Sequence, residues 1–356
     1  MFNAERPYLD TIETSCQTEN LSVCSHINEF RTSDDKKLYI AVDSLAYYKK
    51  LSDNIAKCLV MGAGSDDFVF SDRAKKILNC GSLVTFNNSG TIISANFCRL
   101  RICSMCQRRR ALKVGAEMFR IIENIDGSWL HLVLTVPNVG FSELSDLLDR
   151  MYIASSRLFR YDAVKKAFKG IARFTEITYN SSSDTYHPHF HCLVSVDKSY
   201  FTSRKYIKVD FMRVLWTVIM KSADKGIDIR RKSDSWIDDV IDSLGDDELL
   251  YQIHMGRIND NNKSSAVSEI AKYSVKPLDI GLSGMALYEP LHNIFLALHG
   301  RRFVQTYGNI REVARLLKID FDSDAGDECD ENILDRTNVR SYTWKRNEGR
   351  YVPLSL

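Results

Sequence analysis

The sequence predicts an α/β or α+β core together with a separate small module built around cysteines. Between residues 129 and 276, apolar runs typical of strands alternate with segments whose apolar residues recur at helical spacing. Four cysteines gather between Cys80 and Cys106. With 44% hydrophobic and 26% charged residues among 356, the composition is that of an ordinary globular chain. It excludes collagen-like, low-complexity and wholly disordered proteins.

The core elements follow one another with recognisable boundaries. The first strand is an apolar run between Gly127 and Pro137, and the helix after it has Ser142 as a predicted cap. Two later strands flank a short polar turn and form a predicted hairpin. The expected order is strand 129–138, helix 141–168, strand 171–180, turn 181–185, strand 189–196, helix 206–220, strand 249–258 and helix 264–276.

Charge and composition divide the chain into four predicted segments. Residues 1–35 carry seven acids and two bases without a clear period, so residues 1–55 are predicted as an acidic arm. A cysteine-rich basic module is expected over 56–125, the α/β or α+β core over 126–280, and a helical and acidic region over 281–356. The net charge of +2 conceals a basic run at 98–113, which indicates an anionic partner.

The amino terminus lacks the basic start and apolar stretch of a secretory signal, and no run of 18 apolar residues occurs. We therefore expect a cytoplasmic protein that does not enter a membrane. In that reducing compartment, nine cysteines point to free thiols or metal ligands rather than disulfides.

Four cysteines have the spacing of metal ligands. Two of them form a C-x-x-C knuckle, a third lies five residues earlier, and the first is followed by Gly81. Four thiolates suit a tetrahedral Zn²⁺ site that leaves no open position for catalysis. The sequence therefore predicts a structural zinc module on Cys80, Cys98, Cys103 and Cys106.

A basic helix start follows this module directly. The segment QRRRALKVGAEMFRII has apolar residues at helical spacing, and its first turns carry four bases. Such a helix start, fixed by zinc, is suited to contact phosphates. The predicted DNA-contacting residues are Arg108, Arg109, Arg110 and Lys113, with the cluster of residues 230–232 as a second candidate.

The segment YHPHFHCLVSV places two imidazoles on one face of a strand. Residues two apart share a face, so His189 and His191 point one way while Phe190 and Cys192 point into the packed layer. Glu176 lies on the partner strand, and we expect the hairpin to bring it opposite His191. These three residues predict a metal site with open coordination positions, suited to an oxygenase or to a nuclease. His187 is left out, because Pro188 is expected to break the strand register.

The last predicted helix carries a candidate nucleophile. Glu269 and Tyr273 are four residues apart and share a face, and Lys276 follows one turn later.

The order of these motifs resembles that of the rolling-circle replication initiators of small plasmids, members of the HUH endonuclease superfamily. The motifs are, in order, the cysteines, a strand ending LTVPN, the strand EITYN, HPHFH and EIAKYSVK. The resemblance runs from about Cys80 to Pro277. It implies an α+β fold whose central antiparallel sheet is flanked by helices and carries the histidine pair. Thr135 matches the first motif, Tyr273 the nucleophile and Glu269 a water-activating glutamate. One tyrosine on that helix matches the single-tyrosine class.

The resemblance also implies an activity. Such initiators nick and rejoin one DNA strand at the plasmid origin through a 5′ phosphotyrosine, with Mg²⁺ or Mn²⁺ on the histidines and a glutamate-activated water at termination. Lys276 would neutralise charge at the phosphate. The implied partners are origin DNA, single-stranded at the nick, and a host helicase and polymerase.

Two alternatives stay open. A transposase of the same superfamily would share the metal and the tyrosine and differ in its substrate DNA. A non-enzymatic zinc-containing DNA-binding regulator would need only the cysteines and the basic run, which leaves His189, His191 and Tyr273 unexplained.

Overall fold

The computed structural model describes residues 33–62, 68–245, 250–259, 261, 263–270, 284–321 and 339–354. The chain divides into two compact units, one formed by residues 1–109 with 325–356 and the other by residues 110–324. The boundary at Arg109 falls inside a single helix, α4 (Ser104–Glu123).

These units differ from the four predicted segments. Residues 33–55, expected in the acidic arm, form most of helix α2 (Ser33–Gly62), which buries Leu38, Leu45, Ile55 and Leu59. Part of the carboxyl-terminal region, expected to be helical and acidic, forms two strands instead. Both segments pack within the first unit. Local sequence patterns do not predict this packing, because the partners of each segment are far away in the sequence.

The first unit combines helices with a four-stranded antiparallel sheet of order β2-β1-β8-β9. Strand β1 therefore pairs with a strand some 250 residues later, with Leu83 opposite Thr343. Besides α2 and the start of α4, its elements are α3 (Phe68–Asn79), β1 (Leu83–Phe86), β2 (Ile92–Ala95), β8 (Arg340–Lys345) and β9 (Arg350–Pro353).

A buried charge network joins α2 to the carboxyl-terminal hairpin. The Lys49 side chain is fully buried and donates from Nζ to Asp53 Oδ1 at 2.6 Å and to the carbonyl of Leu78 at 2.8 Å. Asp53 Oδ2 accepts from Trp344 Nε1 at 2.8 Å and from Arg346 Nε at 3.3 Å. Asp53 thus compensates the buried cation and holds β8 against α2.

We expect Asp53→Ala to destabilise the first unit by about 3–5 kcal/mol, because it leaves the buried Lys49 ammonium without its carboxylate partner. Urea unfolding of the full chain, followed by circular dichroism, measures the loss. The double variant Lys49→Met with Asp53→Leu removes both charges and should recover most of the stability. Equal losses in the single and double variants would contradict a charge-based role.

The second unit is built on a five-stranded antiparallel sheet of order β6-β3-β5-β4-β7, which confirms the predicted fold class. The predicted hairpin is β4 and β5, at the centre of the sheet. The strands are β3 (Ser128–Thr135), β4 (Phe168–Asn180), β5 (Thr185–Val196), β6 (Ile253–Ile258) and β7 (Val304–Tyr307).

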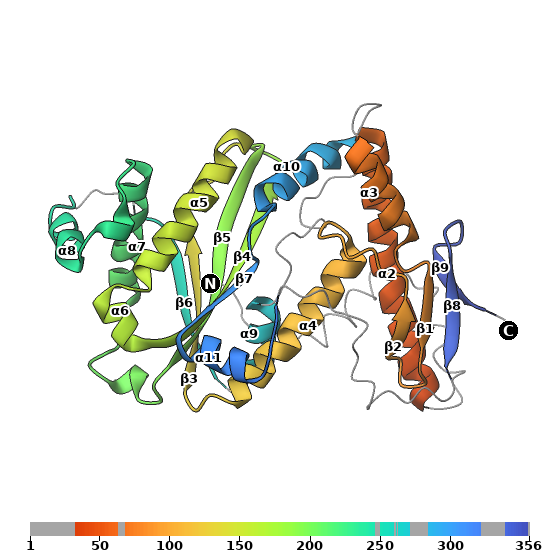
Figure 1. Ribbon diagram of the computed structural model, residues 1–356, viewed down its shortest axis with the longest axis horizontal. Helices are drawn as coiled ribbons and strands as arrows, with labels where there is room; N and C mark the ends of the chain where they lie inside the picture. The colour runs from red at the N-terminus through yellow and green to blue at the C-terminus, as the bar shows by residue number, and fades with distance from the viewer. Residues whose placement is uncertain are drawn as a thin grey trace. The chain divides into compact units, whose positions relative to one another are not determined.

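Helices cover both faces of this sheet (Figure 1). On one face, Leu130, Phe190 and Val194 pack with α5 (Phe141–Leu158) and α7 (Val209–Asp224). On the other, Phe174 and Leu193 pack with the second-unit part of α4, α9 (Lys263–Ile270) and α11 (Gly308–Leu316). The remaining helices are α6 (Asp162–Ala167), α8 (Asp234–Asp242) and α10 (Tyr288–Leu298), with short 3-10 turns at Tyr200–Thr202, Ile229–Arg231 and Gly284–Leu287.

The helix predicted over 141–168 is two helices. It begins as expected, although Gly140 rather than Ser142 is the N-cap residue. The break between α5 and α6 is stabilised by Asp234 of α8, whose carboxylate accepts from Arg157 Nη2 at 2.5 Å and from the backbone N–H of Asp162 at 2.7 Å. This break depends on a tertiary contact that the local sequence does not display. Among the described residues, no helix is both long and apolar enough to cross a membrane.

Candidate functional site

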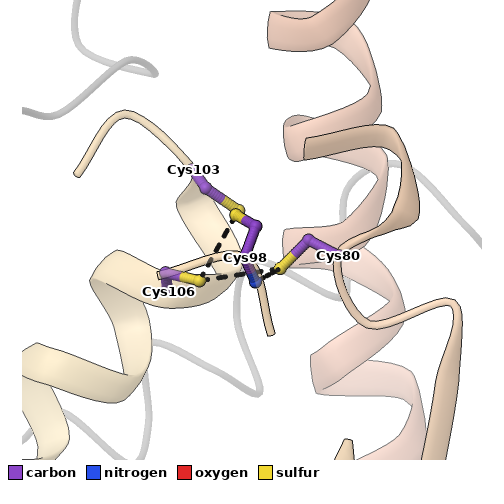
Figure 2. Close-up of side chains that lie close together, drawn as sticks. All are labelled: Cys80, Cys98, Cys103 and Cys106. Atoms are coloured by element: carbon purple, nitrogen blue, oxygen red, sulfur yellow. Dashed lines mark hydrogen bonds between the residues drawn. The ribbon is translucent and has the colours of Figure 1, made fainter. Parts of the chain in front are cut away.

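The four predicted zinc ligands come together in the first unit (Figure 2). Their sulfur atoms all lie within 4.8 Å of one another. Cys106 Sγ is 3.6 Å from Cys80 Sγ and 3.7 Å from Cys98 Sγ. Sulfurs at the ~2.3 Å zinc–sulfur distance of a tetrahedral site lie about 3.8 Å apart, so the cluster fits a thiolate-bound metal.

Backbone and side-chain donors surround the sulfurs. The N–H of Cys98 donates to Cys80 Sγ at 3.3 Å, and the N–H of Arg99 donates to Cys106 Sγ at 3.2 Å. Ser52 Oγ accepts the N–H of Met105 at 3.1 Å, so its hydroxyl hydrogen is available to Cys103 Sγ, 3.4 Å away. These donors stabilise negative sulfur and orient it.

Gly81 is required where the chain turns away from the first ligand. Its φ is +65°, and a β-carbon there would lie 2.4 Å from Met105 Cε.

Hydrogen bonding, first of all from Cys106, holds the pKa of Cys103 well below its usual value. A lowered pKa favours the thiolate form of Cys103, which is the form that binds a metal.

The second predicted group lies on the hairpin at the centre of the other unit's sheet. One carboxylate oxygen, Glu176 Oε2, is 2.8 Å from Nε2 of His189 and 2.8 Å from Nε2 of His191. Both imidazoles are 12% exposed and the carboxylate side chain is 8% exposed. The three ligand atoms thus converge at one largely buried point.

The ladder corrects the predicted register by two residues. Glu176 is opposite His189, not His191, and His191 is opposite Phe174. Because β-strand side chains on one face also meet their diagonal neighbours, Glu176 still reaches both imidazoles.

A contact at the far side of the His189 ring indicates which of its two nitrogens carries the hydrogen. His189 Nδ1 lies 3.2 Å from the carbonyl oxygen of His187, so Nδ1 carries the hydrogen. A neutral imidazole then presents a lone pair at Nε2, and that lone pair faces a carboxylate oxygen. A cation between the two atoms would relieve the repulsion between this lone pair and the carboxylate, which fits a metal site.

The spacing of the ligand atoms also fits. Ligand atoms at about 2.1 Å and at right angles around an octahedral cation lie about 3.0 Å apart. Two histidines and one carboxylate leave further coordination positions for other ligands.

Pro188 does not break the strand, contrary to the prediction. Strand β5 continues through it, and Pro188 is paired with Ile177 of β4. The described ladder to β3 ends at the pair Thr135 and His189, so the missing N–H costs no bond on that side. His187 is not grouped with the ligands among the described residues. Burial, aided by the neighbouring His189, lowers the pKa of His187 and favours its neutral form.

The helix expected to carry the nucleophile begins over the same sheet face. Val267 and Ile270 of α9 pack in one cluster with Leu193, which shares a face of β5 with His189 and His191. The predicted helix over 264–276 is described as Lys263–Ile270. Tyr273, Lys276 and the side chain of Glu269 lie outside the described residues.

Thr135, the threonine of the first motif, is a structural residue at the end of β3. Its Oγ1 donates to the carbonyl of Gln252 at 2.6 Å, and its own carbonyl accepts from Trp216 Nε1 at 2.7 Å. It thereby fixes the strand end beside His189.

The predicted DNA-contacting arginines are partly engaged in packing. Arg108 donates to Ser44 Oγ at 3.1 Å, and its guanidinium carbon lies 5.0 Å from the ring centre of Tyr48. The guanidinium of Arg109 lies 3.7 Å from the ring centre of Phe97. All four residues, Arg108, Arg109, Arg110 and Lys113, are half-buried. In the second candidate cluster, Arg230 and Arg231 pair with Asp228.

Sequence reasoning missed two residues beside the ligands. Ser52 lies in the segment expected to be an arm, and no motif marks it. His131 lies on β3, with Nε2 3.0 Å from His191 Nδ1. The sequence did contain a signal for His131. It is a polar residue inside an apolar strand, and alternation places it on the same face as Val133 and Thr135.

The sequence is similar to known replication proteins. The sequence model of a family described as "Replication protein" matches residues 89–352. A "Protein rep" of Bacillus sp is 32% identical over 273 residues, which are 72% of this chain and 84% of that protein. One of Streptococcus pneumoniae is 27% identical over 256 residues, 69% of this chain and 72% of that protein. One of Staphylococcus aureus is 30% identical over 210 residues, 56% and 81% of the two chains.

No solved structure matches the chain. The family match spans most of the sequence and includes the knuckle cysteines, both strands of the hairpin and the carboxyl-terminal hairpin of the first unit. The chain therefore belongs to the replication-protein family, as the resemblance of its motifs predicts.

Proposed function

We propose that this chain initiates plasmid rolling-circle replication by cutting and rejoining one DNA strand at the origin. The observation that carries the proposal is the convergence of Glu176, His189 and His191 at one point of the sheet, in a chain of the replication-protein family. Nothing in DNA binding alone calls for such a group on a buried strand.

Tyr273 is the proposed nucleophile. Its hydroxyl oxygen attacks the scissile phosphorus, the bond from phosphorus to the 3′ oxygen breaks, and the phenolic proton is lost as the 3′ oxygen gains one. The products are a 5′ phosphotyrosine and a free 3′ hydroxyl that a polymerase extends. Because the phosphodiester is conserved, rejoining needs no ATP.

Glu176, His189 and His191 would hold Mg²⁺ or Mn²⁺. When bound, that cation polarises a phosphate oxygen and so makes the phosphorus a better target for a phenol, whose ordinary pKa is about 10. The protein's own contribution is rigidity, because both histidines and the glutamate stand on adjacent central strands.

Two further residues complete the proposed chemistry. Glu269, four residues before Tyr273 in the sequence, would accept a proton from water at termination. Lys276 would neutralise charge developing at the phosphate. The cysteine cluster would hold a structural Zn²⁺, and the basic start of α4 would contact origin DNA, with a host helicase and polymerase as further partners.

The test combines the full chain, Mn²⁺ or Mg²⁺ and a supercoiled plasmid carrying the candidate origin. We expect relaxed circles and a protein–DNA adduct that survives detergent, and both should be lost with a chelator. His189→Ala should abolish nicking and leave duplex binding largely intact, since phosphate contacts and metal chemistry use different elements. His299→Ala, at an exposed position after α10, is the matched control.

Three results would overturn the proposal. Origin binding without cleavage in either metal would favour the zinc-containing regulator. Cleavage confined to the ends of a mobile element would favour a transposase. Cleavage retained by His189→Ala, with loss of DNA binding, would remove the histidines from the active site.

A further inference from the structure

We propose that His131 is a positioning residue that holds His191 in the tautomer required for metal binding. The inference rests on the proposed function only in that Glu176, His189 and His191 are taken to bind a divalent cation. His131 lies outside the ligand group and contacts the ligand His191.

The two rings are placed for an in-plane hydrogen bond. His131 Nε2 and His191 Nδ1 are 3.0 Å apart, the ring centres are 5.3 Å apart, and the ring planes differ by 20°. The distance between the ring centres exceeds the distance between the two nitrogens by about one ring width. The nitrogens therefore lie between the ring centres, and the rings meet edge to edge. An N–H of one ring therefore points at the lone pair of the other.

The direction of this bond follows from the ligand role of His191. Its Nε2 faces Glu176 and must present a lone pair to a cation, so its hydrogen is on Nδ1. His191 Nδ1 donates and His131 Nε2 accepts. His131 does for His191 what the carbonyl of His187 does for His189, so each ligand ring is fixed by an acceptor behind it.

The position of His131 is itself constrained by neighbouring strands. Its Cα partners are Leu193 on β5 and Gly256 on β6. The ring of His254 packs edge-on against His131, with centres 6.1 Å apart. A β-carbon on Gly256 would lie 3.0 Å from His254 Nε2, so the glycine leaves room for that ring. Half-buried His131 is therefore held in place beside His191.

The experiment compares four full-length proteins without DNA. Electron paramagnetic resonance measures how tightly each one binds Mn²⁺. His131→Leu removes the acceptor and should weaken Mn²⁺ binding roughly 10–100-fold. His131→Gln, whose amide oxygen can reach a similar position, should bind within about threefold of the wild type. His299→Ala, at an exposed position after α10, removes an imidazole away from the site and should bind like the wild type.

A spectroscopic readout separates positioning from general damage. In protein with ¹⁵N-labelled histidine and no added Mn²⁺, the ring nitrogens of His191 should show the Nδ1–H tautomer. His131→Leu should shift His191 toward the Nε2–H tautomer, and His131→Gln should restore it. The thermal midpoint of each variant shows whether the fold is intact.

The outcomes distinguish this inference from the proposed function. If the wild type fails to bind Mn²⁺, or binds it undiminished after His189→Ala, the metal site itself is wrong. If the wild type binds at these ligands and His131→Leu binds equally well with an unchanged His191 tautomer, only the positioning role is wrong. Loss of binding in His131→Gln equal to that in His131→Leu, or an equal loss in His299→Ala, would also overturn it.

Discussion

Replacing Cys103 or Cys106 with serine is expected to release one zinc ion per chain and to unfold the first unit. Structural zinc sites contribute about 10 kcal/mol or more of apparent folding free energy, which is comparable to the whole net stability of a domain. A serine hydroxyl does not ionise near neutral pH, whereas hydrogen bonding from Cys106 holds the pKa of the Cys103 thiol below its usual value. Zinc content by mass spectrometry and thermal unfolding by circular dichroism measure the two effects.

Cys58→Ala is the matched control, because Cys58 is a buried single cysteine on α2 of the same unit. It removes a thiol without touching the cluster and should cost only about 1 kcal/mol, with zinc content unchanged. A wild type that contains no zinc and is normally stable would contradict the module. So would a Cys103→Ser protein that keeps its zinc.

The cysteine cluster shows where local pattern suffices and where it does not. Its ligands lie within 27 residues, so their spacing alone predicted the site. What surrounds it could not be predicted. Ser52 and the Lys49 and Asp53 pair belong to a helix with no motif, and β8 and β9 close the sheet from the other end of the chain.

The hairpin shows the same division. Alternation on each strand and a short polar turn predicted that β4 and β5 pair, and that His189 and His191 share a face. The exact register depends on the turn, and the prediction was wrong by two residues. Glu176 was still identified, because a residue on the correct face reaches both the opposite and the diagonal position. His131 was not identified, because its contact with His191 depends on the order of strands β3, β5 and β4 in the sheet.

Strand β7, four residues that extend the sheet beside β4, was also missed. A strand this short carries too few alternations to be distinguished from a loop.

Tyr273→Phe and Glu269→Ala are expected to separate initiation from termination. Tyr273→Phe removes the nucleophilic oxygen, so covalent adducts and strand transfer on a single-stranded origin oligonucleotide should fall below detection. Slow metal-dependent hydrolysis that needs Glu269 should be the residual activity. Tyr288→Phe, at the start of α10, is the control for loss of a phenol elsewhere. Adduct formation by Tyr273→Phe would place the nucleophile on another residue.

Glu269→Ala should keep the first nick and the adduct but impair release. A protein with one nucleophilic tyrosine would be trapped by a second tyrosyl adduct at the end of a replication round, and water avoids that trap. General-base catalysis contributes about 10²–10⁴-fold, so hydrolytic release should slow by that order. In cells, replication products longer than one plasmid unit should accumulate.

Glu269→Gln sharpens this test, because it keeps the shape of the side chain and removes its basicity. It should behave like Glu269→Ala if the carboxylate takes a proton from water. If both variants instead lose the first nick as completely as Tyr273→Phe, Glu269 is a metal ligand or a structural group. Glu176 would then have to be re-examined as the third ligand, by measuring whether Glu176→Gln weakens Mn²⁺ binding as strongly as His189→Ala.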